Sequence, residues 1–240
     1  MAEYKTISPL DLVAKFQYTI DNHWGYIYGT AGTLWTQAKQ NAATREQTKK
    51  YGSQWIGHYV SDCSGLFYWA FKQLGSYMYH GSNTMYKQYC VNKGRLVNGK
   101  RSDGNGLLAG TAIFTGTETE HGHVGLYIGN GIVIEAKGTQ AGVVKTPITD
   151  SRWTFWGEMK YVDYSMSPQP QPEPPVPEGY AEVIGKRVAL RKAPTTQASI
   201  IMRINTGEMV KIETPPPSEW EYVSYENRYG YMMKEFLNEG

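Results

Sequence analysis

Apolar and polar positions follow a helical spacing in the first part of the chain. The segment SPLDLVAKFQYTI places Ser8 at a candidate N-cap, Pro9 at the first helical position and Asp11 in the first turn, which predicts a helix start. Residues 64–74 are apolar on nearly every side, and Gly75 follows them. This pattern predicts a second helix that is buried and ends at the glycine.

After about residue 106 the spacing changes to that of strands. The segments GTAIF, HVGLYI, IVIEA and GVV are short, apolar and separated by residues that favour turns. Helices followed by antiparallel strands are typical of a layered α+β fold.

A proline-rich stretch divides the chain. Residues 165–179 hold six of the twelve prolines, and such a stretch favours polyproline II over a helix or a strand ladder. We interpret it as a spacer between two folded parts, although it could also be an SH3 or WW ligand. We therefore predict a first domain at 1–164, a linker at 165–178 and a second domain at 179–240. The second domain alternates in short runs split by turn residues, which predicts a small β-barrel.

Composition narrows the possible roles. With 24 Lys and Arg against 22 Asp and Glu, the charge is nearly balanced, which argues against binding to nucleic acid or to a membrane surface. Two cysteines are not a disulfide framework, although one bridge is possible. The N-terminus lacks the apolar region of a signal peptide, and no apolar run reaches 18 residues. We expect synthesis in the cytoplasm and, for a target outside the cell, either release by lysis or a secretion signal that was removed.

Cys63 is the first residue with candidate chemistry. It should lie at the N-terminus of the buried helix, with Asp62 as the cap. Free backbone N–H groups and the positive end of a helix favour the thiolate form of a cysteine. Cys63 could equally be a small buried residue, because a nucleophile also needs a base and a group that orients the base.

His123 is the predicted base. It begins a strand on which Val124 and Leu126 face one way while His123 and Gly125 face the other. The glycine leaves room for a second side chain beside the histidine. His121 is the other candidate, but it lies in the polar segment TETEHG, which predicts that it is exposed.

Glu135, on the next strand, is the predicted orienting group, and strand register decides whether it reaches His123. A two-residue turn at 130–131 would place the two side chains on opposite faces. A three-residue loop at 129–131 would make them diagonal neighbours on one face, within reach of each other. Without that register, Glu135 would be a solvated carboxylate.

These segments together resemble the NlpC family of papain-like cysteine peptidases, which cut bacterial cell-wall peptides. The resemblance covers residues 8–164 and rests on WGYIYGTAG, DCSGLFYWAF, HVGLYIGNG and VIEAKG, four motifs in the family's order. It implies a papain-like α+β fold with helices packed on an antiparallel sheet. It also implies that Cys63 is the nucleophile, His123 the base and Glu135 the third residue, although the family usually has His, Asn or Gln at that third position.

The resemblance further implies three substrate-binding residues. Tyr26 falls where the family has its active-site tyrosine, and Asp62 and Ser64 flank the cysteine as the family's peptide-contacting residues do. About thirty residues separate the tyrosine motif from the cysteine, more than in a minimal member. This insertion either shapes the substrate groove or decorates it.

The tail resembles bacterial SH3-like cell-wall modules through RVALRKAP, INTGEMVKI and WEYVSYENRYGYM. The two resemblances imply an endolysin-like peptidoglycan hydrolase, a thiol endopeptidase that cuts the stem peptide at the cell wall. We expect a monomer with no cofactor and no metal site, because the histidines lack ligand spacing. The alternatives are an N-acetylmuramoyl-L-alanine amidase with the same three residues and a non-catalytic wall-binding protein.

Overall fold

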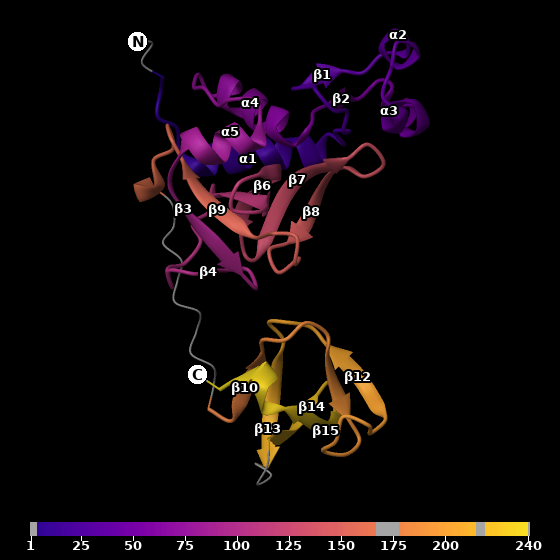
Figure 1. Cartoon of the computed structure of the whole chain (residues 1–240), viewed down its shortest axis with the longest axis vertical. Helices are drawn as coiled ribbons and strands as arrows, with labels where there is room; N and C mark the ends of the chain where they lie inside the picture. Colours follow the sequence, from indigo (N-terminus) through magenta and orange to yellow (C-terminus); the bar gives the residue numbers. More distant parts are fainter. Residues whose placement is uncertain (1–3, 167–177, 215–218, 240) are drawn as a thin grey trace. The chain divides into compact units, whose positions relative to one another are not determined.

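The chain divides into two compact units, Met1–Pro170 and Gln171–Gly240 (Figure 1). This computed structural model describes residues 4–166, 178–214 and 219–239. Most of the predicted linker therefore lies outside the described residues, and the predicted domain bounds stay predictions.

One helix of the first unit begins where the sequence predicts, and a second lies within one residue of its predicted bounds. α1 (Pro9–Asp21) has Ser8 as its N-cap, whose side chain accepts a hydrogen bond from the Leu10 N–H. α4 (Cys63–Gln73) has Asp62 as its N-cap, and it ends just before Gly75, whose φ of 75° is the left-handed conformation that stops a helix. None of the helices in the described residues is long and apolar enough to cross a membrane. The other helical elements are short: α2 (Gln37–Asn41), α3 (Glu46–Tyr51), η1 (Gly52–Trp55), α5 (Ser82–Thr84), η2 (Met85–Tyr89) and η3 (Tyr164–Met166).

The first unit contains a seven-stranded antiparallel sheet in the order β4-β3-β9-β5-β6-β7-β8. The strand segments predicted after residue 106 are confirmed as β5 to β8, whereas β3 and β9 were not predicted. A separate two-stranded pair joins β1 and β2. The bounds are β1 (Thr33–Leu34), β2 (Tyr59–Val60), β3 (Cys90–Val97), β4 (Lys100–Arg101), β5 (Ala112–Gly116), β6 (His121–Gly129), β7 (Ile132–Gly138), β8 (Gly142–Pro147) and β9 (Phe155–Met159).

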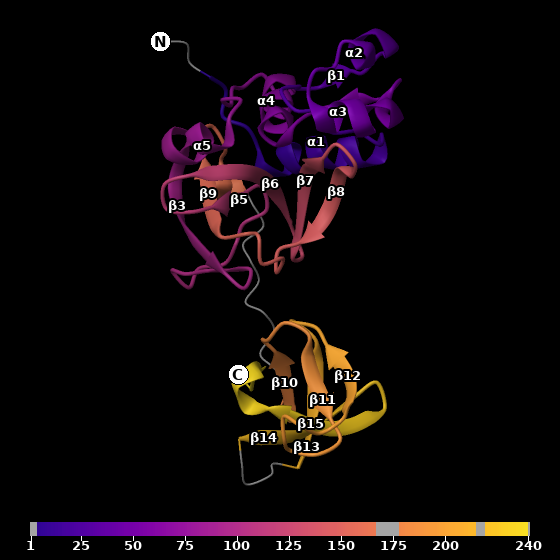
Figure 2. The same cartoon turned by 45° about the vertical axis from the view of Figure 1, so that its right-hand side comes forward.

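The main core lies between the helices and one face of this sheet. α1 and α4 lie along the sheet in both views (Figures 1 and 2), and Phe16 and Phe67 meet edge to face across their interface. Burial of each such ring contributes about 1.5–3 kcal/mol to the free energy of unfolding. A smaller cluster around Trp153 and Trp156 packs on residues of β5 and β7 that point to the other face. The α+β prediction for this unit is confirmed.

The second unit is an all-β domain with its own core. Its strands form one sheet in the order β12-β11-β15-β14-β13-β10-β16 around a buried cluster that includes Leu190, Val223 and Met232. The prediction of a small β-rich domain is confirmed, and this architecture fits an SH3-like module. The bounds are β10 (Tyr180–Val183), β11 (Val188–Arg191), β12 (Ile200–Ile204), β13 (Met209–Thr214), β14 (Trp220–Tyr225), β15 (Arg228–Met233), η4 (Lys234–Phe236) and β16 (Leu237–Asn238).

Candidate active site

Cys63 is the first residue of α4, and its position is fixed through the neighbouring cap. The Asp62 carboxylate accepts hydrogen bonds from the N–H groups of Gly65 (2.7 Å) and Gly29 (2.8 Å). Cys63 itself is 9% exposed. The second cysteine, Cys90, is also unbridged, and burial raises its pKa to about 12. A thiol with so high a pKa is a poor nucleophile, which leaves Cys63 as the candidate nucleophile of the two cysteines.

His123 lies on β6 between two partners. Its Nε2 is 2.6 Å from Oε2 of Glu135, and the Cys63 thiol lies close enough to the imidazole to affect its pKa. Burial lowers the pKa of His123, but its interactions with Cys63 and Glu135 outweigh the effect of burial and raise the pKa to about 9. The Trp153 ring stacks on the imidazole, with 5.8 Å between centroids. The arrangement therefore favours an imidazolium next to the thiol.

The contact between His123 and Glu135 depends on a combination of turn and bulge that was not predicted. The β6–β7 turn has two residues, Asn130 and Gly131, both with positive φ (50° and 70°), as a tight hairpin requires. That turn alone would put Glu135 on the face opposite His123. A β-bulge at 127–129 shifts the pairing by one residue and restores the register expected from a three-residue loop.

Glu135 is fully buried, and both of its oxygens have partners. Besides His123 at Oε2, Thr146 Oγ1 (2.9 Å) and Arg152 Nη2 (2.8 Å) donate to Oε1. Asp150 Oδ2 accepts from the same Nη2 at 3.1 Å and from Arg152 Nε at 3.2 Å. Burial raises the pKa of Glu135, but the hydrogen bonds from His123 and Arg152 outweigh it and lower the pKa to about 2. Glu135 is thus a buried, ionised carboxylate and not the solvated one of the alternative interpretation.

Sequence reasoning missed both additional partners of Glu135. Thr146 lies on β8, where strand alternation would have placed it on the face of Glu135 once the β7–β8 pairing was known. Arg152 lies in the loop after β8 and is 17 positions from Glu135. Its one local signal is Asp150, two residues earlier, whose carboxylate binds the same guanidinium.

His121 does not lie where the sequence predicts. It is 1% exposed, and its ring stacks on Tyr86 with 3.7 Å between centroids and packs edge-on against Phe114 and Phe155. The pairing of β5 with β6 shifts by one residue next to His121. This bulge turns its side chain to the face opposite His123, into the main core. The prediction that His121 is exposed was wrong.

The three predicted substrate-binding residues gather around Cys63. Burial and the negative charges of Cys63 and Asp62 raise the pKa of Tyr26 well above its ordinary value, so its hydroxyl stays protonated. The Ser64 hydroxyl is buried and donates to Asp62 Oδ1 at 3.3 Å. His80, which was not predicted, donates from Nε2 to both oxygens of Asp62 at 2.9 Å. The Asp62 carboxylate is therefore already engaged by the protein.

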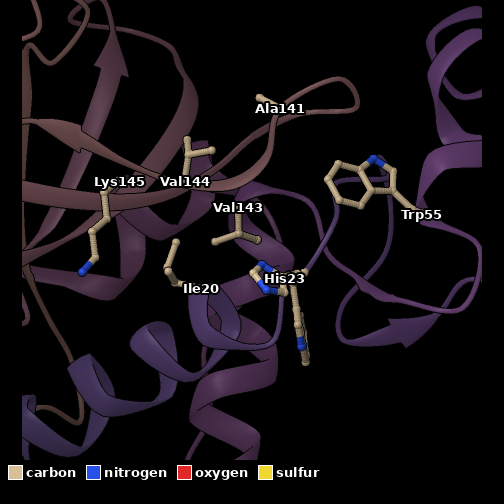
Figure 3. A pocket seen from close by; sticks show the side chains of 8 residues that line it. Ile20, His23, Trp55, Ala141, Val143, Val144 and Lys145 are labelled. Atoms are coloured by element: carbon tan, nitrogen blue, oxygen red, sulfur yellow. The ribbon is translucent and has the colours of Figure 1, made fainter.

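The insertion before Cys63 packs on the β7–β8 connection. Trp55 Nε1 donates to the carbonyl of Thr139 at 2.6 Å. Beside it opens a hollow of about 420 Å³, where His23 and Trp55 lie near Val143 of β8 (Figure 3). Cys63, His123 and Glu135 are not among the residues that line this hollow. The insertion thus shapes a concave surface that is separate from the cysteine–histidine pair.

Comparisons with known proteins point to one family. The model of the NlpC/P60 family matches residues 24–158, which include Tyr26, Cys63, His123 and Glu135. No curated protein matched the sequence. Solved structures are also similar to this chain at low identity, and the three described next each match about three fifths of its length.

NlpC1 from Trichomonas vaginalis is 20% identical with a TM-score of 0.39, over 62% of this chain and 45% of that one. The NlpC/p60 domain of the peptidoglycan hydrolase SagA is 17% identical with a TM-score of 0.41. The match covers 64% of this chain and 100% of the SagA domain. RipD from Mycobacterium tuberculosis, a non-catalytic NlpC/p60 domain protein, is 18% identical with a TM-score of 0.42. The match covers 62% of this chain and 95% of the RipD chain. The chain spans less than half the length of the Trichomonas protein.

Proposed function

This chain belongs to the NlpC/P60 family, whose members are generally cell-wall hydrolases, and we propose that it is a thiol endopeptidase that cuts the stem peptide of bacterial peptidoglycan. The observation that carries the proposal is the grouping of Cys63, His123 and Glu135, in which a cysteine at a helix N-terminus lies beside an imidazole held by a buried carboxylate. This is the arrangement that nucleophilic catalysis by cysteine requires.

The reaction begins with attack on the peptide carbonyl. The Cys63 thiolate forms a C–S bond to the carbonyl carbon, and the carbonyl oxygen becomes an oxyanion. The N–H of Cys63, at the first position of α4, has no partner within the helix, and together with the Tyr26 hydroxyl it stabilises that charge. The His123 imidazolium then gives its proton to the leaving amine, and the C–N bond breaks to leave a thioester on Cys63.

Hydrolysis of the thioester uses the same groups. His123, now neutral, takes a proton from water as the water attacks the thioester carbonyl, and the C–S bond breaks. Glu135 accepts from His123 throughout and stabilises the imidazolium each time it forms. Thr146 and Arg152 hold Glu135, so the carboxylate remains in place while the charge on His123 changes.

The second unit has a separate role in this proposal. Its all-β fold fits an SH3-like module, and we assign it to binding of the cell wall, where the enzyme acts as an endolysin-like protein. A wall-binding module raises the local concentration of the catalytic unit on an insoluble substrate.

Mass spectrometry of purified wall digested by the full chain tests the proposed function. New amino termini within the stem peptide support the endopeptidase. Peptides freed from muramyl lactyl groups would instead identify an N-acetylmuramoyl-L-alanine amidase that uses the same three residues. Binding to the wall without any cleavage product would overturn both activities and leave a wall-binding protein.

A further inference from the structure

A second carboxylate–imidazole pair lies next to the proposed catalytic residues. His80 precedes α5, and its Nε2 is 2.9 Å from each oxygen of Asp62, the residue that caps the helix of Cys63. Its ring also stacks on Tyr68 of the same helix, with 6.1 Å between centroids. His80 is therefore attached both to the N-cap and to the middle of α4.

The residues that follow His80 are attached to the strand of the catalytic histidine. Ser82 Oγ donates to the carbonyl of His121 at 2.7 Å, and Asn83 Oδ1 accepts from the His121 N–H at 3.3 Å. His121 is the first residue of β6, two positions before His123. Residues 80–83 thus connect the start of α4 to the start of β6.

Packing reinforces this connection at both ends. Ser82 is 9% exposed, and Tyr86, a few residues later, stacks on the His121 ring with 3.7 Å between centroids. At the other end, the hydrogen bond to Asp62 and the carboxylate's charge raise the pKa of His80, although burial opposes the rise. Both ends are held by partly or fully buried contacts, which solvent weakens little.

We propose that His80 is a positioning residue, and that the bridge 80–83 holds Cys63 and His123 at the separation that proton transfer between them requires. The bridge touches neither reacting atom, so it acts through Asp62 and His121. The consequence of this bridge for catalysis rests on the proposed function. Its effect on the separation of Cys63 and His123 does not. A displacement of about 1 Å at such a pair can lower the rate about 100-fold.

Alkylation of Cys63 by iodoacetamide tests this proposal without any substrate. The rate is measured in the full chain by peptide mapping, at about pH 7, where His123 is an imidazolium, and at about pH 10, above the His123 pKa of about 9. Cys90 is buried and its pKa is raised, so its alkylation reports unfolding in the same samples. A failure of the wall digest would leave this measurement valid, so the two proposals can fail separately.

The variants separate positioning from simple stability. His80→Phe keeps a ring that can stack on Tyr68 but removes the donor to Asp62, and we expect the pH 7 to pH 10 rate ratio to fall about 10- to 100-fold. Ser82→Ala should lower the ratio in the same direction, while His80→Gln, which can still donate, should recover most of it. The matched control is His58→Phe, because the His58 ring packs edge-on against Trp55, away from Asp62.

The proposal is overturned if His80→Phe leaves the ratio at the value of His58→Phe while Cys90 stays unalkylated. If His80→Phe exposes Cys90, the decision rests on the other two variants. In that case the bridge is overturned if Ser82→Ala leaves the pH 7 to pH 10 rate ratio unchanged. It is also overturned if His80→Gln lowers the ratio as much as His80→Phe does while Cys90 stays unalkylated.

Discussion

The Glu135 carboxylate lies 2.6 Å from His123 Nε2, although the hairpin turn between their strands would by itself place the two side chains on opposite faces. A bulge in β6 corrects the register, and burial then makes the contact strong, because few water molecules compete with it. The two pKa shifts have opposite signs, to about 9 for His123 and to about 2 for Glu135, as expected for an ion pair. The charge on each residue therefore depends on the other.

Glu135→Gln should move the alkaline limb of the activity profile to lower pH. The pKa of His123 is raised from 6.5 to about 9 partly by the negative charge of Glu135, and the imidazolium is lost as pH rises through that value. The amide can still accept from the imidazole but carries no charge, so the pKa should fall towards 6.5 while measurable activity remains. A pH–rate profile with an unmoved alkaline limb would contradict this account. Glu135→Ala should lower activity more than Glu135→Gln does, because alanine cannot accept a hydrogen bond from the imidazole.

Arg152→Gln should shift the same limb in the opposite direction. The guanidinium lies 2.8 Å from Glu135 Oε1 and offsets part of its charge. Without it, the carboxylate should hold the imidazolium of His123 more strongly and raise its pKa above about 9. Arg95→Gln is the control, because Arg95 pairs with Glu118 on an exposed surface. A downward shift in Arg152→Gln, or equal shifts in both variants, would show that Arg152 does not act through Glu135.

His123→Ala and His121→Ala should fail in different ways. Loss of His123 should abolish hydrolysis while the chain stays folded, because the imidazole is the proposed proton carrier. Loss of the buried His121 ring should instead destabilise the chain by about 2–4 kcal/mol, since it leaves a cavity among Tyr86, Phe114 and Phe155. Thermal unfolding and activity measured on both variants check this. Normal activity in His123→Ala would exclude it as the base.

The parts of the fold that follow from local rules could be predicted from the sequence. Ser8 and Pro9 mark the start of α1, and Gly75 follows the end of α4, because capping depends on a few adjacent residues. The strands β3 and β9 could not be recognised in this way. β9 is buried along its whole length and β3 is mostly exposed, so neither shows the alternation that marks a strand with one buried face.

The residues proposed for the candidate site stand out in the sequence, whereas the contacts that support them do not. Cys63, His123 and Glu135 stand out because their residue types are rare in otherwise apolar segments. The bulges that aim His123 and bury His121 depend on pairing across strands, which no local pattern specifies. Arg152 and His80 reach their carboxylates across 17 and 18 positions, so only the folded chain brings them together.

Separation of the two units should divide binding from cleavage. Each unit has its own buried cluster, so we expect residues 1–164 and 179–240 to fold as separate soluble fragments. The first should cleave small soluble stem peptides but lose activity on intact wall, and the second should bind wall without cutting it, because tethering matters only for an insoluble substrate. If the first fragment is folded by circular dichroism but inactive on small peptides, the second unit contributes to the active site.

The most direct test of the central claim, that Cys63 is the nucleophile, is the release of new amino groups from purified wall by matched cysteine variants. Cys63→Ala should reduce the rate by several orders of magnitude while the fold is retained, as removal of a catalytic nucleophile does. Cys90→Ala removes the other, buried cysteine and should cleave wall at nearly the rate of the unaltered chain. Comparable release of amino groups by Cys63→Ala would contradict the thiol-peptidase mechanism.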